Sequence, residues 1–253
     1  MAVFNSNGVR IHFLDEGKGD PVMLVHGFAS NAENNWVTTG WLKFLTPHYR
    51  VLALDCRGHG KSDKPHEAAE YTIEKMTGDV TGLLDHLGIR RAFLMGYSMG
   101  GRISMGLMTM HPDRFRAIVL GGVGWGVTSA VGNSDRRNAI VNALLADDPK
   151  SIKEETPRLF RAFAESNHND LHALAACMGS HRPELDNDEF AAVKLPVLIV
   201  IGTKDTTVGS AEPIQKMIPG SRLVTLEGRD HLNAPGDRHY KEVVLEFFRS
   251  APN

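Results

Sequence analysis

The apolar and polar positions of the chain form short blocks that alternate between the patterns of strands and helices. Residues 22–25 and 51–54 are continuously apolar, which is typical of strands buried on both faces of a sheet. Residues 9–14 alternate between apolar and polar side chains, as in a strand with one covered face. The same criteria predict further strands at residues 92–95, 117–120, 196–202 and 222–226.

Helical periodicity separates these predicted strands. Residues 72–87 carry apolar side chains at helical spacing and end before Gly88, a residue type that commonly stops a helix. Similar patterns predict helices at residues 36–45, 102–110, 135–145, 151–165, 168–178 and 241–249. Ser151 and Glu154 have the spacing of a capping box at the start of one of them. Alternating strands and helices of this length predict an α/β fold, with a mostly parallel sheet flanked by helices on both faces.

Residues 124–194 interrupt the alternation, because they contain helical patterns and no convincing strand. A helical insertion between two strands of a sheet is most simply a small lid over the strand ends. No repeat, low-complexity tract or linker separates it from the rest of the chain. We therefore expect residues 1–253 to form a single domain, with a lid insertion at about 124–194.

The composition narrows the choice of partners and compartment. The formal net charge is −2, which leaves no basic excess to neutralise a phosphate backbone, so we expect no nucleic-acid partner. The first ten residues lack a secretory pattern, and no apolar run approaches the roughly 20 residues that span a bilayer. We expect a cytoplasmic protein with no membrane partner and with reduced thiols at Cys56 and Cys177. The sequence leaves open whether the protein forms a homo-oligomer.

The candidate chemistry begins at Gly96-Tyr97-Ser98-Met99-Gly100, a G-x-S-x-G sequence between a predicted strand and a predicted helix. In this context the motif predicts a nucleophile elbow, a sharp turn that exposes the serine hydroxyl at the end of the sheet. Gly96 and Gly100 suit such a turn, because the backbone on either side of the serine passes close to neighbouring atoms. The alternative is a glycine-rich loop with no catalytic role. The motif therefore indicates a nucleophile only if the chain also supplies a base and an acid.

A serine nucleophile needs a base and a group that orients the base, and the chain offers both in the order Ser, Asp, His. Asp205 follows the predicted strand at 196–202, and His231 follows the strand at 222–226. Asp205 could instead bond its own turn. Asp55 is better suited to bracing a loop, and Asp230 adjoins His231 too closely in sequence to face the same imidazole nitrogen. We therefore predict Ser98, Asp205 and His231 as the catalytic residues.

Acyl transfer also needs amide donors for an oxyanion. The backbone N–H of Met99, at the start of the elbow helix, and that of Phe28, after the second predicted strand, are the candidates. Phe28 and Met99 can also form apolar pocket walls. His26 and Trp125 are candidates for the substrate pocket, although a histidine before a glycine at a strand end can equally brace the loop.

A metal site is the alternative for some of the twelve histidines. His168 and His172 are spaced to share a helix face, which is compatible with zinc. Asn169 stands where a metalloprotease carries its glutamate, and no third ligand is evident, so we expect a solvated helix face there. We predict no metal and no organic cofactor.

With the elbow, the glycine loop, the acid and the histidine in order, the chain resembles the α/β-hydrolase family over residues 9–123 and 195–249. The segment from Asp55 to Pro65 is similar to a loop shared by small esterases, lactonases, carbon–carbon hydrolases, epoxide hydrolases and haloalkane dehalogenases. In the last two groups the elbow nucleophile is an aspartate, so Ser98 argues against both. The lid resembles that of no single substrate class and is shorter than the caps of many relatives.

The resemblance implies a serine hydrolase that works through an acyl-enzyme, with a small molecule as its substrate. We expect it to cleave a carboxylic ester of a small to medium apolar acyl compound, with lactones, thioesters and carbon–carbon bonds of vinylogous diketones as alternatives within the same machinery. A ligand-binding or signalling protein that keeps the fold but turns over slowly or not at all is the rival from another class. A scaffold protein with a vestigial site is the third hypothesis.

Overall fold

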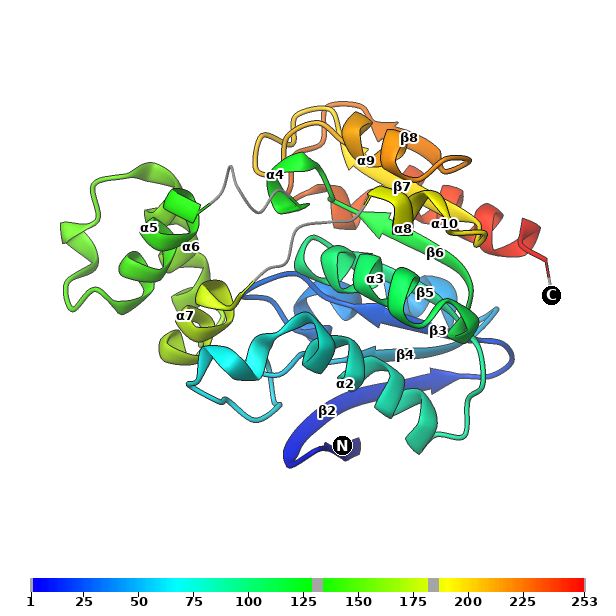
Figure 1. The fold of residues 1–253 in the computed structure, drawn as a ribbon, viewed down its shortest axis with the longest axis horizontal. Helices are drawn as coiled ribbons and strands as arrows, with labels where there is room; N and C mark the ends of the chain where they lie inside the picture. Colours follow the sequence, from blue (N-terminus) through cyan, green and yellow to red (C-terminus); the bar gives the residue numbers. More distant parts are fainter. Residues whose placement is uncertain (1, 129–133, 182–186, 253) are drawn as a thin grey trace.

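The structure is a computed structural model that describes residues 2–128, 134–181 and 187–252. Its described part contains an eight-stranded sheet in the order β1-β2-β4-β3-β5-β6-β7-β8 (Figure 1). β2 pairs antiparallel with β1 and β4, and the other neighbouring strands pair in parallel. The strands are β1 (Ala2–Ser6), β2 (Val9–Gly17), β3 (Pro21–Val25), β4 (Arg50–Leu54), β5 (Ala92–Tyr97), β6 (Phe115–Gly121), β7 (Val197–Gly202) and β8 (Arg222–Leu226). The predicted α/β fold with a mostly parallel sheet is confirmed.

Helices connect the strands and lie on both faces of the sheet. The described α-helices are α1 (Trp41–Leu45), α2 (Ile73–His86), α3 (Met99–Met110), α4 (Trp125–Thr128), α5 (Ser134–Leu145), α6 (Glu155–Ser166), α7 (Leu171–Gly179), α8 (Asn187–Ala191), α9 (Glu212–Met217) and α10 (Arg238–Ser250). Short π- or 3-10 turns are η1 (Glu33–Val37), η2 (Ala68–Tyr71), η3 (Pro112–Arg114), η4 (Pro149–Ser151) and η5 (Ala234–Gly236).

The continuously apolar strands divide their side chains between two cores. Successive side chains of a strand point to opposite faces. In β3, Met23 and Val25 therefore join the core under α2 and α3, whereas Val22 and Leu24 join the core under α1 and α10. This double burial is why the strands read as unbroken apolar runs.

Helices α5, α6 and α7 form a small group set apart from the sheet (Figure 1). Ile140, Ala164 and Leu174, one from each helix, pack together with Ala29, which lies just after the end of β3. The group therefore sits at the carboxyl ends of the parallel strands. In the sequence it falls between β6 and β7. The predicted limits of the lid, 124–194, and the single domain over 1–253 stay predictions.

Several predicted elements need correction. The helix predicted at 36–45 is split, because Gly40 adopts a left-handed conformation (φ 82°) between η1 and α1. The capping box is wrong: Ser151 lies in η4 and its hydroxyl donates to the carbonyl of Asp148, and the side chain of Glu154, the N-cap of α6, caps nothing. The edge strand β1 and the short helices α4, α8 and α9 have no counterpart in the prediction.

No helix in the described part of the chain could cross a membrane. None of them combines the length and the apolar character that crossing a bilayer requires.

Candidate active site

The elbow between β5 and α3 holds Ser98 in a strained backbone conformation. Ser98 has φ 54° and ψ −111°, a region that costs an L residue on the order of 1–3 kcal/mol. Its N–H donates to the carbonyl of Gly121 at 2.8 Å, which fixes the turn. A Cβ on Gly96 would lie 2.1 Å from the carbonyl oxygen of Gly100, and one on Gly100 would lie 2.0 Å from that of Val25. Both glycines are therefore required by close backbone approach.

The structure brings Ser98, His231 and Asp205 into one hydrogen-bonded line. His231 Nε2 lies 2.9 Å from Ser98 Oγ, and His231 Nδ1 lies 2.7 Å from Asp205 Oδ2. With a proton on Nδ1 donated to the carboxylate, Nε2 is free to accept the proton of the serine hydroxyl. The three side chains come from the carboxyl ends of β5, β7 and β8. This arrangement can activate a serine oxygen as a nucleophile.

Asp205 is held more firmly than its hydrogen bond to His231 alone would require. Its side chain is fully buried, and its second oxygen, Oδ1, lies within hydrogen-bonding distance of the amides of Thr207 (3.1 Å) and Val208 (3.3 Å). Asp230, the neighbour of His231, instead accepts from the amides of Leu232 and Asn233 and closes its own turn. Asp230 is thus engaged elsewhere, and the carboxylate that faces His231 is that of Asp205.

Tyr97 positions the loop that carries His231. Its hydroxyl donates to the backbone carbonyl of His231 at 2.7 Å, and the two rings lie 5.3 Å apart. Burial raises the pKa of this phenol well above its ordinary value, so it stays a neutral donor. The sequence alone assigns Tyr97 no role, because its position inside the motif accepts many residue types.

The loop after β3 places the amide of Phe28 beside the serine. A Cβ on Gly27 would lie 3.4 Å from Ser98 Cβ, so the backbone at this point runs against the nucleophile. Within the described residues, neither the Phe28 nor the Met99 amide has a hydrogen-bond acceptor. Both residues line the cavity at Ser98. Two amide donors without acceptors next to a serine can stabilise an oxyanion, which keeps both residues as the predicted donors.

His26 does not lie in the pocket, which corrects one of the two pocket predictions. It is fully buried, its Nδ1 lies 2.7 Å from the carbonyl oxygen of Gly27, and its Nε2 accepts from the amide of Cys56 at 2.9 Å. Burial lowers its pKa, so the imidazole is neutral and one nitrogen donates while the other accepts. The Gly27 carbonyl belongs to the same peptide as the Phe28 N–H, so His26 orients a candidate oxyanion donor.

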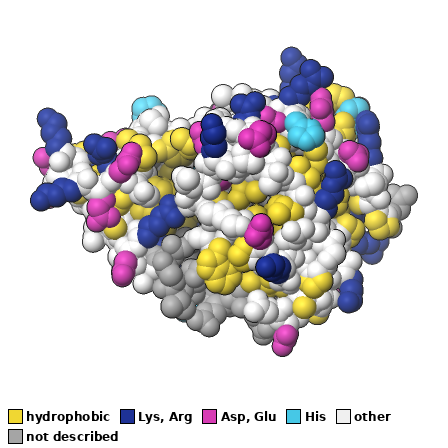
Figure 2. All heavy atoms as spheres, turned by 90° about the horizontal axis from the view of Figure 1, so that it is seen from above, with side chains coloured by type: hydrophobic (Ala, Val, Ile, Leu, Met, Phe, Trp, Pro, Cys, Tyr) yellow, Lys and Arg dark blue, Asp and Glu magenta, His cyan; other side chains and the backbone are white. Residues whose placement is uncertain are grey.

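A cavity opens at Ser98 between α3 and the helices α5, α6 and α7. Its volume is about 80 Å³, a size that suits a short acyl chain. The apolar part of its wall includes Phe28, Met76, Ile103, Ile140 and Phe160. On the face of the molecule seen from above, hydrophobic side chains reach the surface and charged side chains of both signs are scattered among them (Figure 2).

Known proteins share this fold and the segment that carries the elbow. A family model described as the alpha/beta hydrolase fold matches residues 20–130, the part that contains the elbow. A solved hydrolase from Pseudomonas aeruginosa PA01 shares 27% identity and a TM-score of 0.82, covering 98% of this chain and 97% of its own. The chain has the alpha/beta hydrolase fold.

Relatives of this α/β hydrolase differ in their reactions. A Bacillus subtilis protein named as a putative 2-succinyl-6-hydroxy-2,4-cyclohexadiene-1-carboxylate synthase is 24% identical, over 97% of each chain. A solved enol-lactonase from Burkholderia xenovorans LB400 is 26% identical with a TM-score of 0.76, covering 98% of this chain and all of its own. Matching epoxide hydrolases, including one from Siraitia grosvenorii at 36% identity, align over only about a third of their length. The comparisons therefore support the hydrolase fold without fixing a substrate.

Trp125 is the second pocket prediction that this α/β hydrolase does not bear out. Its side chain is 49% exposed at the start of α4. The described wall of the cavity includes the adjacent Gly126 and not Trp125. An aromatic residue after a strand end suggests a pocket wall from sequence, but the helix that starts there turns its side chain outward.

Three arginines in the cavity wall are absent from the sequence prediction. Arg102 comes from α3, four residues after Ser98, and Arg136 and Arg137 come from the lid helix α5. The pocket of this hydrolase is thus partly cationic, whereas the sequence predicts an apolar one. Arg102 could have been found from its place one helical turn after the nucleophile; the two lid residues carry no such signal.

The segment between α6 and α7 holds the loop that carries Phe28. Ala29 has a left-handed conformation (φ 56°), and its carbonyl accepts from the side-chain amides of Asn167 (3.1 Å) and Asn169 (2.8 Å). Asn169 therefore has a structural partner. The metal alternative at His168 and His172 receives no support, since the described residues contain no group of three or more side chains suited to a metal.

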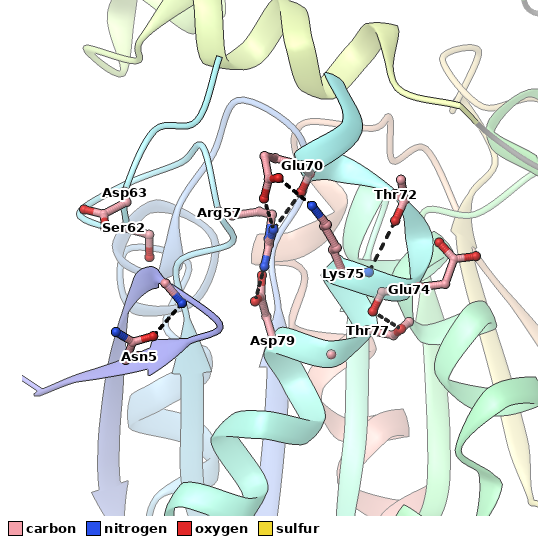
Figure 3. A network of polar contacts seen from close by, with 12 residues as sticks. Asn5, Arg57, Ser62, Asp63, Glu70, Thr72, Glu74, Lys75, Thr77 and Asp79 are labelled. Atoms are coloured by element: carbon pink, nitrogen blue, oxygen red, sulfur yellow. Dashed lines mark hydrogen bonds and ion pairs between the residues drawn. The ribbon is translucent and has the colours of Figure 1, made fainter. Parts of the chain in front are cut away.

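The loop from Asp55 to Pro65 is held by hydrogen bonds and an ion pair. The Asp55 carboxylate bonds the His12 ring and accepts from the amides of Ala32 and Lys61, which agrees with the predicted bracing role. Arg57 forms a two-pronged ion pair with Asp79 of α2, with both nitrogen–oxygen distances at 2.7 Å (Figure 3). These contacts fix the loop without adding a reactive group.

Proposed function

We propose that this α/β hydrolase is a serine hydrolase that cleaves a carboxylic ester, a lactone or a thioester of a small to medium acyl compound. The observation that carries the proposal is the line of Ser98, His231 and Asp205, with distances of 2.9 and 2.7 Å. Esterases and an enol-lactonase among the matching structures support this class of reaction.

The first step forms an acyl-enzyme. His231 Nε2 takes the proton of the Ser98 hydroxyl as its oxygen attacks the substrate carbonyl carbon. Asp205 stabilises the imidazolium that results and keeps the ring in its orientation. The amides of Phe28 and Met99 donate to the oxyanion, where loss of one such donor typically costs about 3 kcal/mol. His231 then gives its proton to the leaving alcohol or thiol, and the carbon–oxygen or carbon–sulfur bond breaks.

The second step releases the acid by the same groups. A water molecule in the place of the leaving group gives a proton to His231 and attacks the acyl carbonyl. Collapse of the second oxyanion returns the proton to Ser98 Oγ and frees the carboxylic acid. The narrow cavity at Ser98 favours a short acyl group in this conformation.

Covalent labelling tests whether Ser98 is activated. A fluorophosphonate should add to the wild-type chain, with the added mass on the peptide that contains Ser98. Labelling should fall to background in Asp205→Asn, while Ser166→Ala in α6, whose hydroxyl donates to the carbonyl of Phe163 one helical turn earlier, serves as a matched control. An unlabelled Ser98 in the folded wild type would contradict the proposal.

Turnover separates an enzyme from a receptor with the same fold. Aryl esters of short acids should be hydrolysed over many cycles by the wild type and not by Ser98→Ala. A single stoichiometric release without further turnover would support the rival, a ligand-binding or signalling protein.

A carbon–carbon bond hydrolase is the second candidate. Its support comes from a relative: a Metapseudomonas resinovorans hydrolase named for a hexa-2,4-dienoic acid substrate is 34% identical over 47% of this chain. A vinylogous diketone offered beside the aryl esters decides between them. A kcat/KM higher for the diketone than for each ester would favour this candidate.

A further inference from the structure

The cavity wall contains three arginine side chains and, within the described residues, no carboxylate paired with them. The guanidinium of Arg102, on α3, has neither a hydrogen bond nor an ion pair in the described part of the chain. Arg136 donates to the carbonyl of Thr207 at 2.8 Å. Arg137 donates to the carbonyl oxygens of Met178 and Ser180. These carbonyl groups hold the two arginines of α5 in place, and within the described residues neither guanidinium forms an ion pair with a carboxylate.

Among the described residues, the carboxylates that attract these arginines bond other groups or lie at longer range. Asp205 attracts Arg136 but bonds His231, and Glu74 attracts Arg102 only weakly. Burial, and then the positive charge of Arg137, lower the pKa of Arg102 to about 10, so the guanidinium is still protonated at neutral pH. A partly buried cation without a partner is costly, and the cost is recovered when an anion binds.

We infer that the cavity recognises an acyl compound with a second, anionic group, a carboxylate, which Arg102 binds from the core and Arg137 faces from the lid. The inference rests on the proposed function, because it assigns the acyl side of that substrate. Arginine suits this task, since its planar fork donates two parallel hydrogen bonds to a carboxylate.

The position of Arg102 sets the length of the acyl chain. Ser98 and Arg102 are four residues apart, and a helix rises about 6 Å over four residues. Ser98 and Arg102 also line one cavity of about 80 Å³, so the carboxylate lies only a few carbon atoms from the carbonyl that Ser98 attacks. Short dicarboxylic acids, esterified at one end, have this form.

Matched esters test the inference. The mono-4-nitrophenyl ester of adipic acid carries the carboxylate, and its methyl ester is a neutral counterpart of nearly the same shape. The wild type should prefer the carboxylate form by about tenfold or more in kcat/KM. Arg102→Met should bring this ratio close to one, and Arg102→Lys should keep part of it. Arg158→Met, which removes an exposed lid arginine outside the cavity wall, should leave the ratio as in the wild type.

Binding to Ser98→Ala keeps the two proposals separable. Calorimetry with adipate and with dimethyl adipate measures anion recognition without chemistry. Tighter binding of adipate, lost on adding Arg102→Met, supports the inference even if no ester is hydrolysed. Hydrolysis of both esters at equal kcat/KM, or equal binding of the two diacid forms, would overturn the inference and leave the serine hydrolase proposal standing.

Discussion

Asp205 and His231 share a hydrogen bond of 2.7 Å although 26 residues separate them in the chain. The loops after β7 and β8 are tied together, since the amide of Lys204 donates to the carbonyl of Arg229 at 2.9 Å. Gly202 is needed for this contact, because a Cβ there would lie 2.1 Å from the same carbonyl oxygen. The approach of the acid to the imidazole is thus built into the backbone of both loops.

Asp205→Asn should lower kcat by a factor on the order of 10³–10⁴ with little change in fold. The amide can no longer hold the imidazole in the tautomer that leaves Nε2 free as a base. Asp230→Asn is the matched control, since its carboxylate closes a turn and does not face the ring. Steady-state kinetics on an aryl ester compares kcat of the two variants. Equal losses of kcat would show that Asp205 is not the carboxylate that orients His231.

Gly100→Ala should destabilise the fold by more than about 3 kcal/mol or prevent folding. The new Cβ would lie 2.0 Å from the carbonyl oxygen of Val25, and neither backbone can move without disturbing the elbow. Gly78→Ala is the control: this glycine lies inside α2, and a Cβ there would meet no atom within 4 Å, so the change should stabilise by roughly 0.5–1 kcal/mol. Urea unfolding measures both free energies.

The free energy of unfolding should fall on acidification because of buried histidine. Burial lowers the pKa of His59 from 6.5 to about 3, and the ring has no exposed surface. Between pH 3 and pH 6.5 the unfolded chain binds more protons than the folded chain. The free energy of unfolding is therefore highest above pH 6.5 and decreases as the pH falls. His59 alone should cost roughly 2 kcal/mol between pH 7 and pH 5. His26, whose pKa burial also lowers, adds to the same trend.

His59→Gln provides the test of this pH effect. Urea unfolding at pH 7 and pH 5 should show a smaller acid loss in this variant than in the wild type. His48→Gln, at an exposed site, should keep the wild-type loss. An unchanged acid loss in His59→Gln would mean that other groups cause it.

Asn169→Ala should lower kcat more than it raises KM. Asn169 donates to the carbonyl of Ala29 at 2.8 Å, next to the residue whose amide is a proposed oxyanion donor. Loss of one hydrogen bond is worth about 1 kcal/mol, or roughly a fivefold loss of kcat if the whole effect reaches the transition state. The lid variant Ser166→Ala again serves as the control. A change in KM alone would assign Asn169 to substrate binding instead.

Much of the sheet and the order of the three reactive side chains could be predicted from the sequence. Strands such as β3 follow turn residues and carry a strong apolar signal, so their limits agree with the prediction to within one residue. The elbow depends on two glycines that no larger residue could replace. Ser98, Asp205 and His231 each follow a strand end, and parallel strands bring such ends to one edge.

What could not be predicted depends on contacts between distant segments. His26 and Trp125 follow strand ends as the reactive residues do, but the loop buries one and α4 exposes the other. The arginines of the cavity become neighbours only when α5 packs near α3, and a helix pattern treats exposed and cavity-facing arginines alike. The break at Gly40 also follows from tertiary packing, because the apolar pattern runs through it.

Trapping the acyl-enzyme decides whether Ser98 is the nucleophile that the other assignments require. Rapid mixing of the wild type with a 4-nitrophenyl ester, followed by acid quenching and peptide mass analysis, should show the acyl mass on the peptide that contains Ser98, together with a burst of one nitrophenolate per chain. Ser98→Ala should show neither. Turnover by Ser98→Ala at the wild-type rate would contradict the serine mechanism. An acyl group that forms on another residue and is hydrolysed at the rate of turnover would contradict it as well.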